Sequence, residues 1–83
     1  MGTLMHDTGR VLAHLFNAEA RGERDVETMA RKLAMERNVV RYHLDRLKEA
    51  RLADMETGKY LYGHVYWGLT AEGRKHVVEG KPV

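Results

Sequence analysis

The sequence contains no cysteine, and this absence excludes disulfide bonds, thiolate metal sites and cysteine nucleophiles together. It contains no apolar run that approaches the roughly 18 residues of a membrane-spanning helix. The opening segment, MGTLMHDTGR, lacks the basic and then apolar layout of a signal peptide. These absences predict a cytoplasmic protein with no membrane partner.

Motifs of nucleotide binding and catalysis are absent as well. The sequence has neither a GxGxxG or phosphate-loop glycine pattern nor an order of Ser, His and Asp with a nucleophile elbow. No two of its five histidines are spaced i, i+4, and no cysteine is available to complete a transition-metal shell. We therefore expect no enzyme, no metal site and no cofactor.

Length and composition indicate one small globular domain, residues 1–83, without room for a separate ligand-binding domain. Hydrophobic residues make up 43% of the chain and charged residues 31%, which is typical of a globular protein in water. The formal net charge is only +2. Nucleic-acid binding would therefore depend on one basic face and not on the total charge.

The stretch from Asp25 to Leu52 predicts two helices joined by a tight turn. Its first half carries apolar residues at i, i+3, i+4 and i+7, which form one helical stripe: Val26, Met29, Ala30 and Leu33. Asp25 is placed to accept the amide protons of the first turn. In the second half Val40, Leu44 and Leu47 repeat the spacing, and His43 beside them is expected to be a half-buried structural residue. This pattern indicates a helix-turn-helix.

The connection between these helices is the short run AMERN, residues 34–38. Met35 is expected to pack inward. Either Glu36 or Asn38 is expected to cap the second helix, and the sequence leaves both open.

A further helix is predicted over about residues 7–20, before the helix-turn-helix. Four apolar residues are expected to face the core: Val11, Leu12, Leu15 and Phe16. Leu4 and Met5 extend this stripe, either to cover the domain's own core or to form a homodimer seam. Gly22 is expected to cap the end of this segment.

From Ala53 to Leu69 the period becomes that of strands. Val65, Trp67 and Leu69 alternate as in a half-buried strand, and the partner strand carries Ala53 and Met55 on one face. The turn region between them, residues 58–64, would form a wing. Thr70 is expected to cap a last short helix, TAEGRKHVV, with Val77 and Val78 as its apolar residues and Gly80-Lys81-Pro82 at its end.

The runs VVRYHLDRLKEARL and YWGLTAEGR resemble the DNA-binding domains of the ArsR-like and MarR-like bacterial regulators, over about residues 10–78. The resemblance implies an α+β winged helix-turn-helix, with a three-helix core, a β-hairpin wing and a short C-terminal helix. Two positions depart from the family pattern, which often has glycine in the turn at Ala34 and favours a helix-ending glycine at Arg51. Arg51 would be strained by roughly 1 kcal/mol in that glycine conformation, so either it accepts the strain or the helix ends differently.

The outer side of the second helix would lie in a major groove. Arg41 is the candidate for a guanine contact and Asn38 for an adenine contact, because each matches the paired groups on that base. Tyr42, Arg46 and Lys48 would contact phosphate or sugar. The wing would add Lys59, Tyr60 and His64. A plain solvated helix face is the alternative for the helix residues, and packing against the sheet is the alternative for Tyr60 and Tyr62. The carboxylates of Asp45 and Glu49 oppose tight binding.

The sequence thus predicts a sequence-specific regulator of transcription that binds double-stranded DNA as a homodimer. The N-terminal and C-terminal helices would form the dimer contact. The alternative is a winged-helix module that binds another protein without direct DNA contact, since one fold serves many functions.

Overall fold

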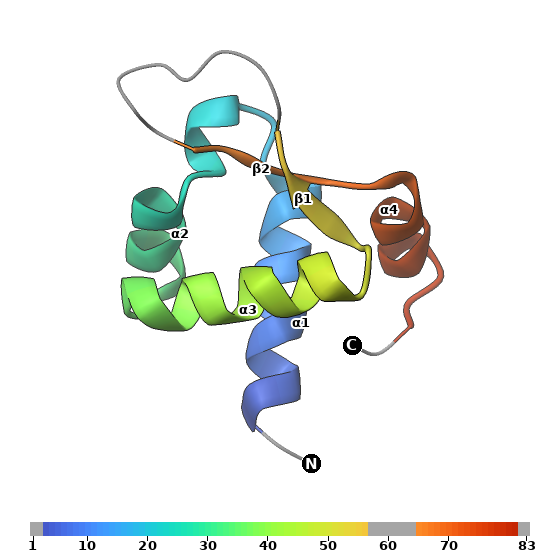
Figure 1. Cartoon of the computed structure of the whole chain (residues 1–83), viewed down its shortest axis with the longest axis horizontal. Helices are drawn as coiled ribbons and strands as arrows, with labels where there is room; N and C mark the ends of the chain where they lie inside the picture. The colour runs from blue at the N-terminus through green and yellow to red at the C-terminus, as the bar shows by residue number, and fades with distance from the viewer. Residues whose placement is uncertain (1–2, 57–64, 82–83) are drawn as a thin grey trace.

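The computed structural model describes residues 3–56 and 65–81, and it leaves the side chains of residues 3–6 and 21 undescribed. The architecture is α+β (Figure 1). In chain order its elements are α1 (Thr3–Asn17), the 3-10 turn η1 (Arg21–Glu23), α2 (Val26–Leu33), α3 (Arg37–Glu49), β1 (Ala53–Met55), β2 (Trp67–Leu69) and α4 (Ala71–Val78).

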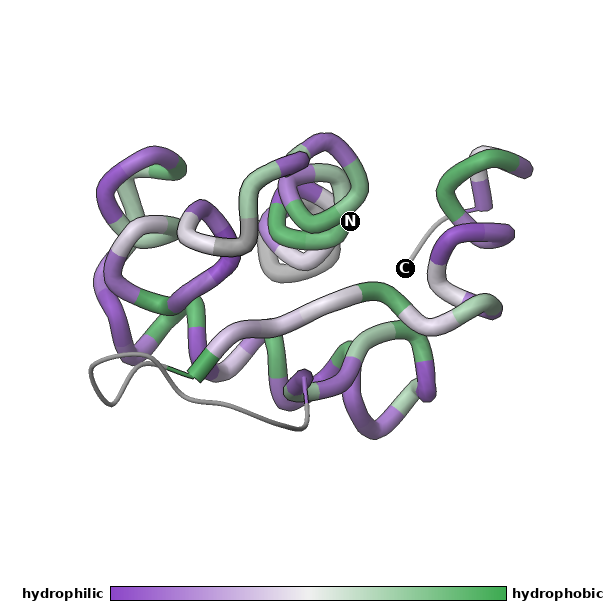
Figure 2. Tube along the Cα trace, turned by 90° about the horizontal axis from the view of Figure 1, so that it is seen from above, coloured by the Kyte–Doolittle hydropathy of each residue, from purple (hydrophilic) through white to green (hydrophobic). Residues whose placement is uncertain are grey.

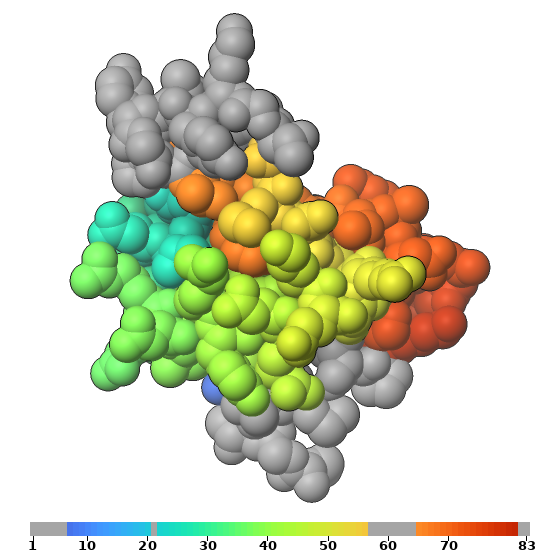
Figure 3. Space-filling view, in the orientation of Figure 1, coloured from blue at the N-terminus to red at the C-terminus, as the bar shows by residue number. Residues whose placement is uncertain are grey.

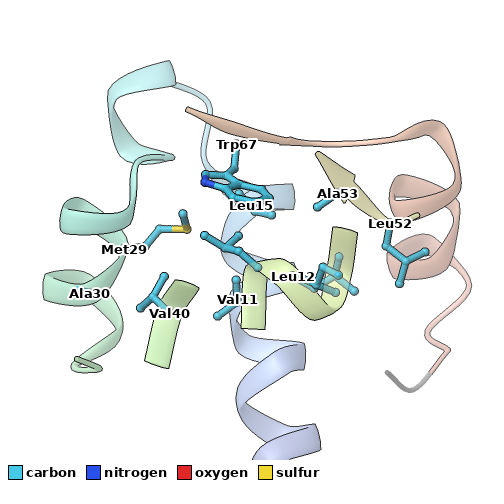
Figure 4. Packing of buried hydrophobic residues seen from close by; sticks show 11 residues of the cluster. Val11, Leu12, Leu15, Met29, Ala30, Val40, Leu52, Ala53 and Trp67 are labelled. Atoms are coloured by element: carbon cyan, nitrogen blue, oxygen red, sulfur yellow. The ribbon is translucent and has the colours of Figure 1, made fainter. Parts of the chain in front are cut away.

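Helix α1 lies at the centre of the arrangement. Figure 2 shows it nearly end-on, with α2 on one side and α4 on the other, while α3 crosses it on a further side. The core fills the space between these helices and the sheet (Figure 4). Its buried residues are Val11, Leu12, Leu15, Met29, Ala30, Val40, Leu44, Leu47, Leu52, Ala53 and Trp67.

The predicted helix-turn-helix is confirmed. Asp25 caps α2 by accepting a hydrogen bond from the Thr28 amide at 2.9 Å. All four residues of the α2 stripe pack into the core or against it, as do Val40, Leu44 and Leu47 of α3 and the turn residue Met35. Apolar periodicity was sufficient here because both helices bury a single face.

Of the two residues expected to cap α3, the structure has Glu36 at the cap position. Its side chain makes no capping hydrogen bond, and Asn38 lies inside the helix. The prediction for His43 also needs correction, because the residue is completely buried and not half-buried.

Two apolar residues predicted to face inward do not. Phe16 is 36% exposed, because the buried stripe of α1 runs from Thr8 to Leu15 and Phe16 falls at its edge. Val65 is 37% exposed, because it precedes β2 and lies outside the sheet. Gly22 does not cap a helix but lies within η1. The side chains of Leu4 and Met5, and the whole turn region 58–64, lie outside the described residues.

The sheet consists of two short antiparallel strands, in which Asp54 lies opposite Gly68 and Met55 opposite Trp67. Thr70 caps α4 as predicted, by accepting a hydrogen bond from the Gly73 amide at 3.0 Å. Val77 packs against the core, whereas Val78 is 71% exposed.

None of the helices in the described part of the chain is long and apolar enough to cross a membrane.

Candidate nucleic-acid interface

The outer face of α3 forms a green to yellow band across the molecule in Figure 3. α2 lies toward its left end, the sheet lies above it and α4 lies to its right. On the opposite face of the helix Val40, His43, Leu44 and Leu47 are at most 1% exposed. The side chains left in solvent include all five of the predicted DNA contacts on α3: Asn38, Arg41, Tyr42, Arg46 and Lys48. The residues that anchor the helix are thus separate from those that it presents.

Arg41 is held by two neighbours. Its Nε group donates a hydrogen bond to Asp45 Oδ1 at 3.3 Å, one helical turn further along. Its guanidinium carbon also lies 5.9 Å from the centre of the Trp67 ring, within the range of a cation–π contact. This side chain therefore leans from α3 toward strand β2.

Tyr42 and Arg46 form a second pair on the same face. The Arg46 guanidinium lies 5.8 Å from the centre of the Tyr42 ring, and its Nη1 group is 3.5 Å from the Tyr42 hydroxyl. The Tyr42 ring also contacts the buried His43 ring edge-on, with the two ring centres 5.3 Å apart. The pair is thus joined to the core through Tyr42. A charged group and a phenol are thus placed where a phosphate oxygen could accept hydrogen bonds from both.

The remaining predicted contacts are more dispersed. Asn38 lies in the first turn of α3, whereas Lys48 lies near its far end and faces Asp54 of β1, with Nζ and Oδ1 4.0 Å apart. Lys59, Tyr60 and His64 lie outside the described residues. The structure thus groups Arg41, Tyr42 and Arg46 on the middle of the helix, with Asn38 toward its start.

Two residues of the first turn of α3 were missed by sequence reasoning. Arg37 was assigned to the turn, but it begins the helix and forms an ion pair with Glu27 of α2 at 3.4 Å. Val39, to which no role was assigned, is 37% exposed. The sequence carried no signal for either, because only the exact start of α3 decides which residues face outward.

An open depression of about 540 Å³ lies where α2 meets the start of α3. Its lining mixes two arginines with two carboxylates: Glu27, Ala30, Arg31, Met35, Glu36, Arg37 and Asn38. It lacks the enclosed apolar walls of a small-molecule site. Among the described residues, no three His, Asp or Glu side chains are grouped to hold a metal ion.

His43 connects α3 to α1 beneath this face. Its Nδ1 atom shares a 2.8 Å hydrogen bond with the Thr8 hydroxyl, and its buried Nε2 atom has no hydrogen-bond partner within the described part of the chain. Burial lowers the pKa of His43 below the ordinary 6.5, Asp7 opposes this shift and Arg46 adds to it. The ring is thus a structural group and is kept neutral.

Arg24 fixes the base of the hairpin. Its guanidinium donates hydrogen bonds to Glu56 Oε2 at 2.6 Å, to the Trp67 carbonyl at 2.8 Å and to the Ala18 carbonyl at 3.3 Å. The Trp67 amide donates in turn to the Arg24 carbonyl at 3.0 Å. The segment before α2 therefore holds both ends of the hairpin that leads into and out of residues 57–64.

Comparison with known proteins supports the fold. No protein-family model matches the chain, and no curated protein does. Among solved structures, a variant of ZitR from Lactococcus lactis superposes with a TM-score of 0.78 at 21% identity, over 93% of this chain and 55% of ZitR. A variant of MepR from Staphylococcus aureus gives 0.64 at 21% identity, over 92% of this chain and 51% of MepR.

A third structure has nearly the same length as this chain. It is a protein from Ralstonia eutropha JMP134, described provisionally as DNA-binding, and it gives a TM-score of 0.69 at 20% identity over 95% of both chains. The chain spans about half of the length of ZitR and MepR. These likenesses confirm the winged helix-turn-helix fold that the sequence predicted, and at this identity they show the fold alone.

Proposed function

We infer that this chain is a transcription regulator that binds double-stranded DNA and reads its sequence through α3 in the major groove. One observation carries the proposal: α3 is anchored by a fully buried face and presents Arg41, Tyr42 and Arg46 together on the opposite face. This division is the one that a recognition helix requires. The Ralstonia protein of matching length, itself described provisionally as DNA-binding, supports the same direction.

The residues of the face divide by chemistry. Arg41 would read guanine and Asn38 adenine, because a guanidinium and a carboxamide each match two groups on one base edge. Tyr42, Arg46 and Lys48 would position the helix on phosphates, and Lys59, Tyr60 and His64 would extend the contact to the flanking groove.

A homodimer formed through α1 and α4 would place two copies of α3 on a two-fold related site, with half-sites about one helical turn apart. The exposed Phe16 of α1 and Val78 of α4 are apolar groups that such an interface could cover. A selected DNA site with two inverted half-sites would support this assembly.

The experiment is fluorescence anisotropy of labelled random duplex DNA at about 50 and 200 mM salt, together with a site selected from a random pool. We expect affinity to fall with salt with a slope near −0.9 for each neutralised phosphate. Arg41→Ala should lose about 5- to 150-fold on the selected site and much less on random DNA. Lys32→Ala is the control, because it removes one exposed positive charge from α2, outside both α3 and the proposed dimer helices.

Equal losses for Arg41→Ala on both DNAs would remove the specificity role of Arg41. If the wild type binds no DNA even at the lower salt, the alternative is favoured, in which this face serves a protein partner.

A further inference from the structure

Asp45 is the one carboxylate in contact with Arg41 among the described residues, and the position of this contact on the guanidinium is informative. The hydrogen bond uses Nε, on the side of the guanidinium nearer the backbone. No other hydrogen bond of Arg41 is found within the described ranges, so its two terminal Nη groups stay available. Those two groups are the donors that match guanine O6 and N7.

Trp67 restrains the same guanidinium from another element. Its ring is 1% exposed and belongs to the core, so its position is fixed by packing. With Asp45 on α3 and Trp67 on β2, Arg41 is held from two directions before any ligand arrives. A side chain fixed in its binding geometry loses less conformational entropy on binding.

The Arg41–Asp45 ion pair contributes little to folding stability, so stability does not explain why it is present. The Arg41 and Asp45 side chains are 57% and 56% exposed, and ion pairs this exposed add little to stability. Entry into a DNA groove would remove water from the pair and strengthen it. The Asp45 carboxylate would also repel phosphates, so it would weaken binding to every DNA sequence while it directs Arg41.

We propose that Asp45 is a positioning residue that makes Arg41 selective for guanine and lowers affinity for DNA of other sequence. The proposal rests on the DNA-binding function proposed above. Asp45 would therefore orient Arg41 toward guanine in addition to repelling phosphates.

The test uses a matched control on the same helix. Glu49 is exposed and forms no ion pair within the described part of the chain, so Glu49→Ala removes the same charge without touching Arg41. Affinities of wild type, Asp45→Ala, Asp45→Asn, Glu49→Ala and Arg41→Ala are measured by anisotropy on random duplex and on the selected site. Each guanine of that site is replaced in turn by 7-deazaguanine, which lacks the N7 acceptor.

We expect one guanine position per half-site at which 7-deazaguanine weakens the wild type about fivefold and leaves Arg41→Ala nearly unchanged. Asp45→Ala should lose most of this sensitivity and bind random DNA about two- to fourfold more tightly. Asp45→Asn keeps an oxygen acceptor without the charge, so it should retain the guanine sensitivity while random binding tightens. Glu49→Ala should tighten both DNAs by the same factor and keep the sensitivity.

The inference is overturned if Asp45→Ala and Glu49→Ala change both affinities alike, or if no guanine position depends on Arg41. Complete absence of wild-type binding to random DNA is a different result, because it would overturn the proposed function itself. All variants are exposed-site changes, and unfolding midpoints equal to that of the wild type confirm that the fold is intact.

Discussion

Two residues other than glycine hold a left-handed backbone conformation among those that the structure describes: Ala34, with φ of 56°, and Arg51, with φ of 65°. Arg51 follows α3, where the Leu52 amide donates to the Leu47 carbonyl and the Arg51 amide to the Lys48 carbonyl. This is the hydrogen-bond pattern of a Schellman motif, in which glycine is favoured. Arg51 therefore adopts the strained left-handed conformation, and α3 ends with the same backbone geometry that a glycine would give.

Arg51→Gly should stabilise the protein. The left-handed conformation costs a residue with a β-carbon about 1–2 kcal/mol, and the extra freedom of glycine in the unfolded chain offsets part of the gain. We expect the free energy of unfolding to rise by about 0.5–1 kcal/mol, measured by urea denaturation. Arg51→Ala is the control, since alanine keeps the strain; an equal gain in both variants would show that the arginine side chain matters and not φ.

Between elements, α4 approaches the residue before β1 very closely, at Gly73. A β-carbon built on Gly73 would lie 1.9 Å from the Leu52 carbonyl oxygen, which is backbone and has little room to move. The same carbonyl accepts a hydrogen bond from the Thr70 amide at 3.1 Å. The position of α4 against the sheet thus depends on the absence of one side chain.

Gly73→Ala should separate these elements. We expect a loss of about 2–3 kcal/mol in the free energy of unfolding, since overpacking at a backbone contact is relieved only by moving a whole element. Gly22→Ala is the matched control, because nothing lies within 4 Å of its β-carbon position and it is expected to be neutral or slightly stabilising. Thermal or urea unfolding of both variants measures the difference, and a neutral Gly73→Ala would contradict the packing argument.

The helices of the core could be predicted from the sequence, while several boundaries and outward positions could not. Apolar spacing and the caps Asp25 and Thr70 located α2, α3 and α4 because each signal is local. Phe16 was misplaced because the buried stripe of α1 includes Thr8, a polar residue that pairs with His43 from another helix. Such a pairing depends on tertiary contact and leaves no periodic signal.

The candidate site could likewise be predicted only in part from the sequence. The exposure of Arg41, Tyr42 and Arg46 followed from the helical period, and the structure confirms it. The contact of Arg41 with Trp67 joins residues of two distant elements, and no spacing in the sequence indicates it. The first turn of α3 was misjudged because no side chain caps it, so the sequence carried no mark of its start.

At the scale of the whole molecule, stability is expected to depend on pH through His43. Its pKa is lower in the folded state than the ordinary 6.5, chiefly because of burial. Below pH 6.5 the unfolded chain therefore binds a proton that the folded chain resists, and the free energy of unfolding falls as the pH falls. Above pH 6.5 the contribution of His43 is fully present.

Urea unfolding between pH 8 and pH 5 measures this dependence. His43→Gln should flatten the curve below pH 6.5, because glutamine keeps a polar contact with Thr8 and does not titrate there. Other groups titrate in both proteins, so the difference between the two curves isolates His43. Parallel curves would show that this ring does not govern the acid sensitivity.

Trp67 takes part in two tasks that proteins usually keep apart. Its ring is buried in the core beside Leu15 of α1, and the Arg41 guanidinium lies over the same ring on the surface side. If α3 reads DNA as proposed, a substitution at Trp67 would change both the folding stability and the position of Arg41, and through Arg41 the DNA sequence that is bound. On the proposed function, evolution of the core around Trp67 and evolution of DNA selectivity would therefore be coupled, and homologues with a repacked core would be expected to prefer different DNA sequences.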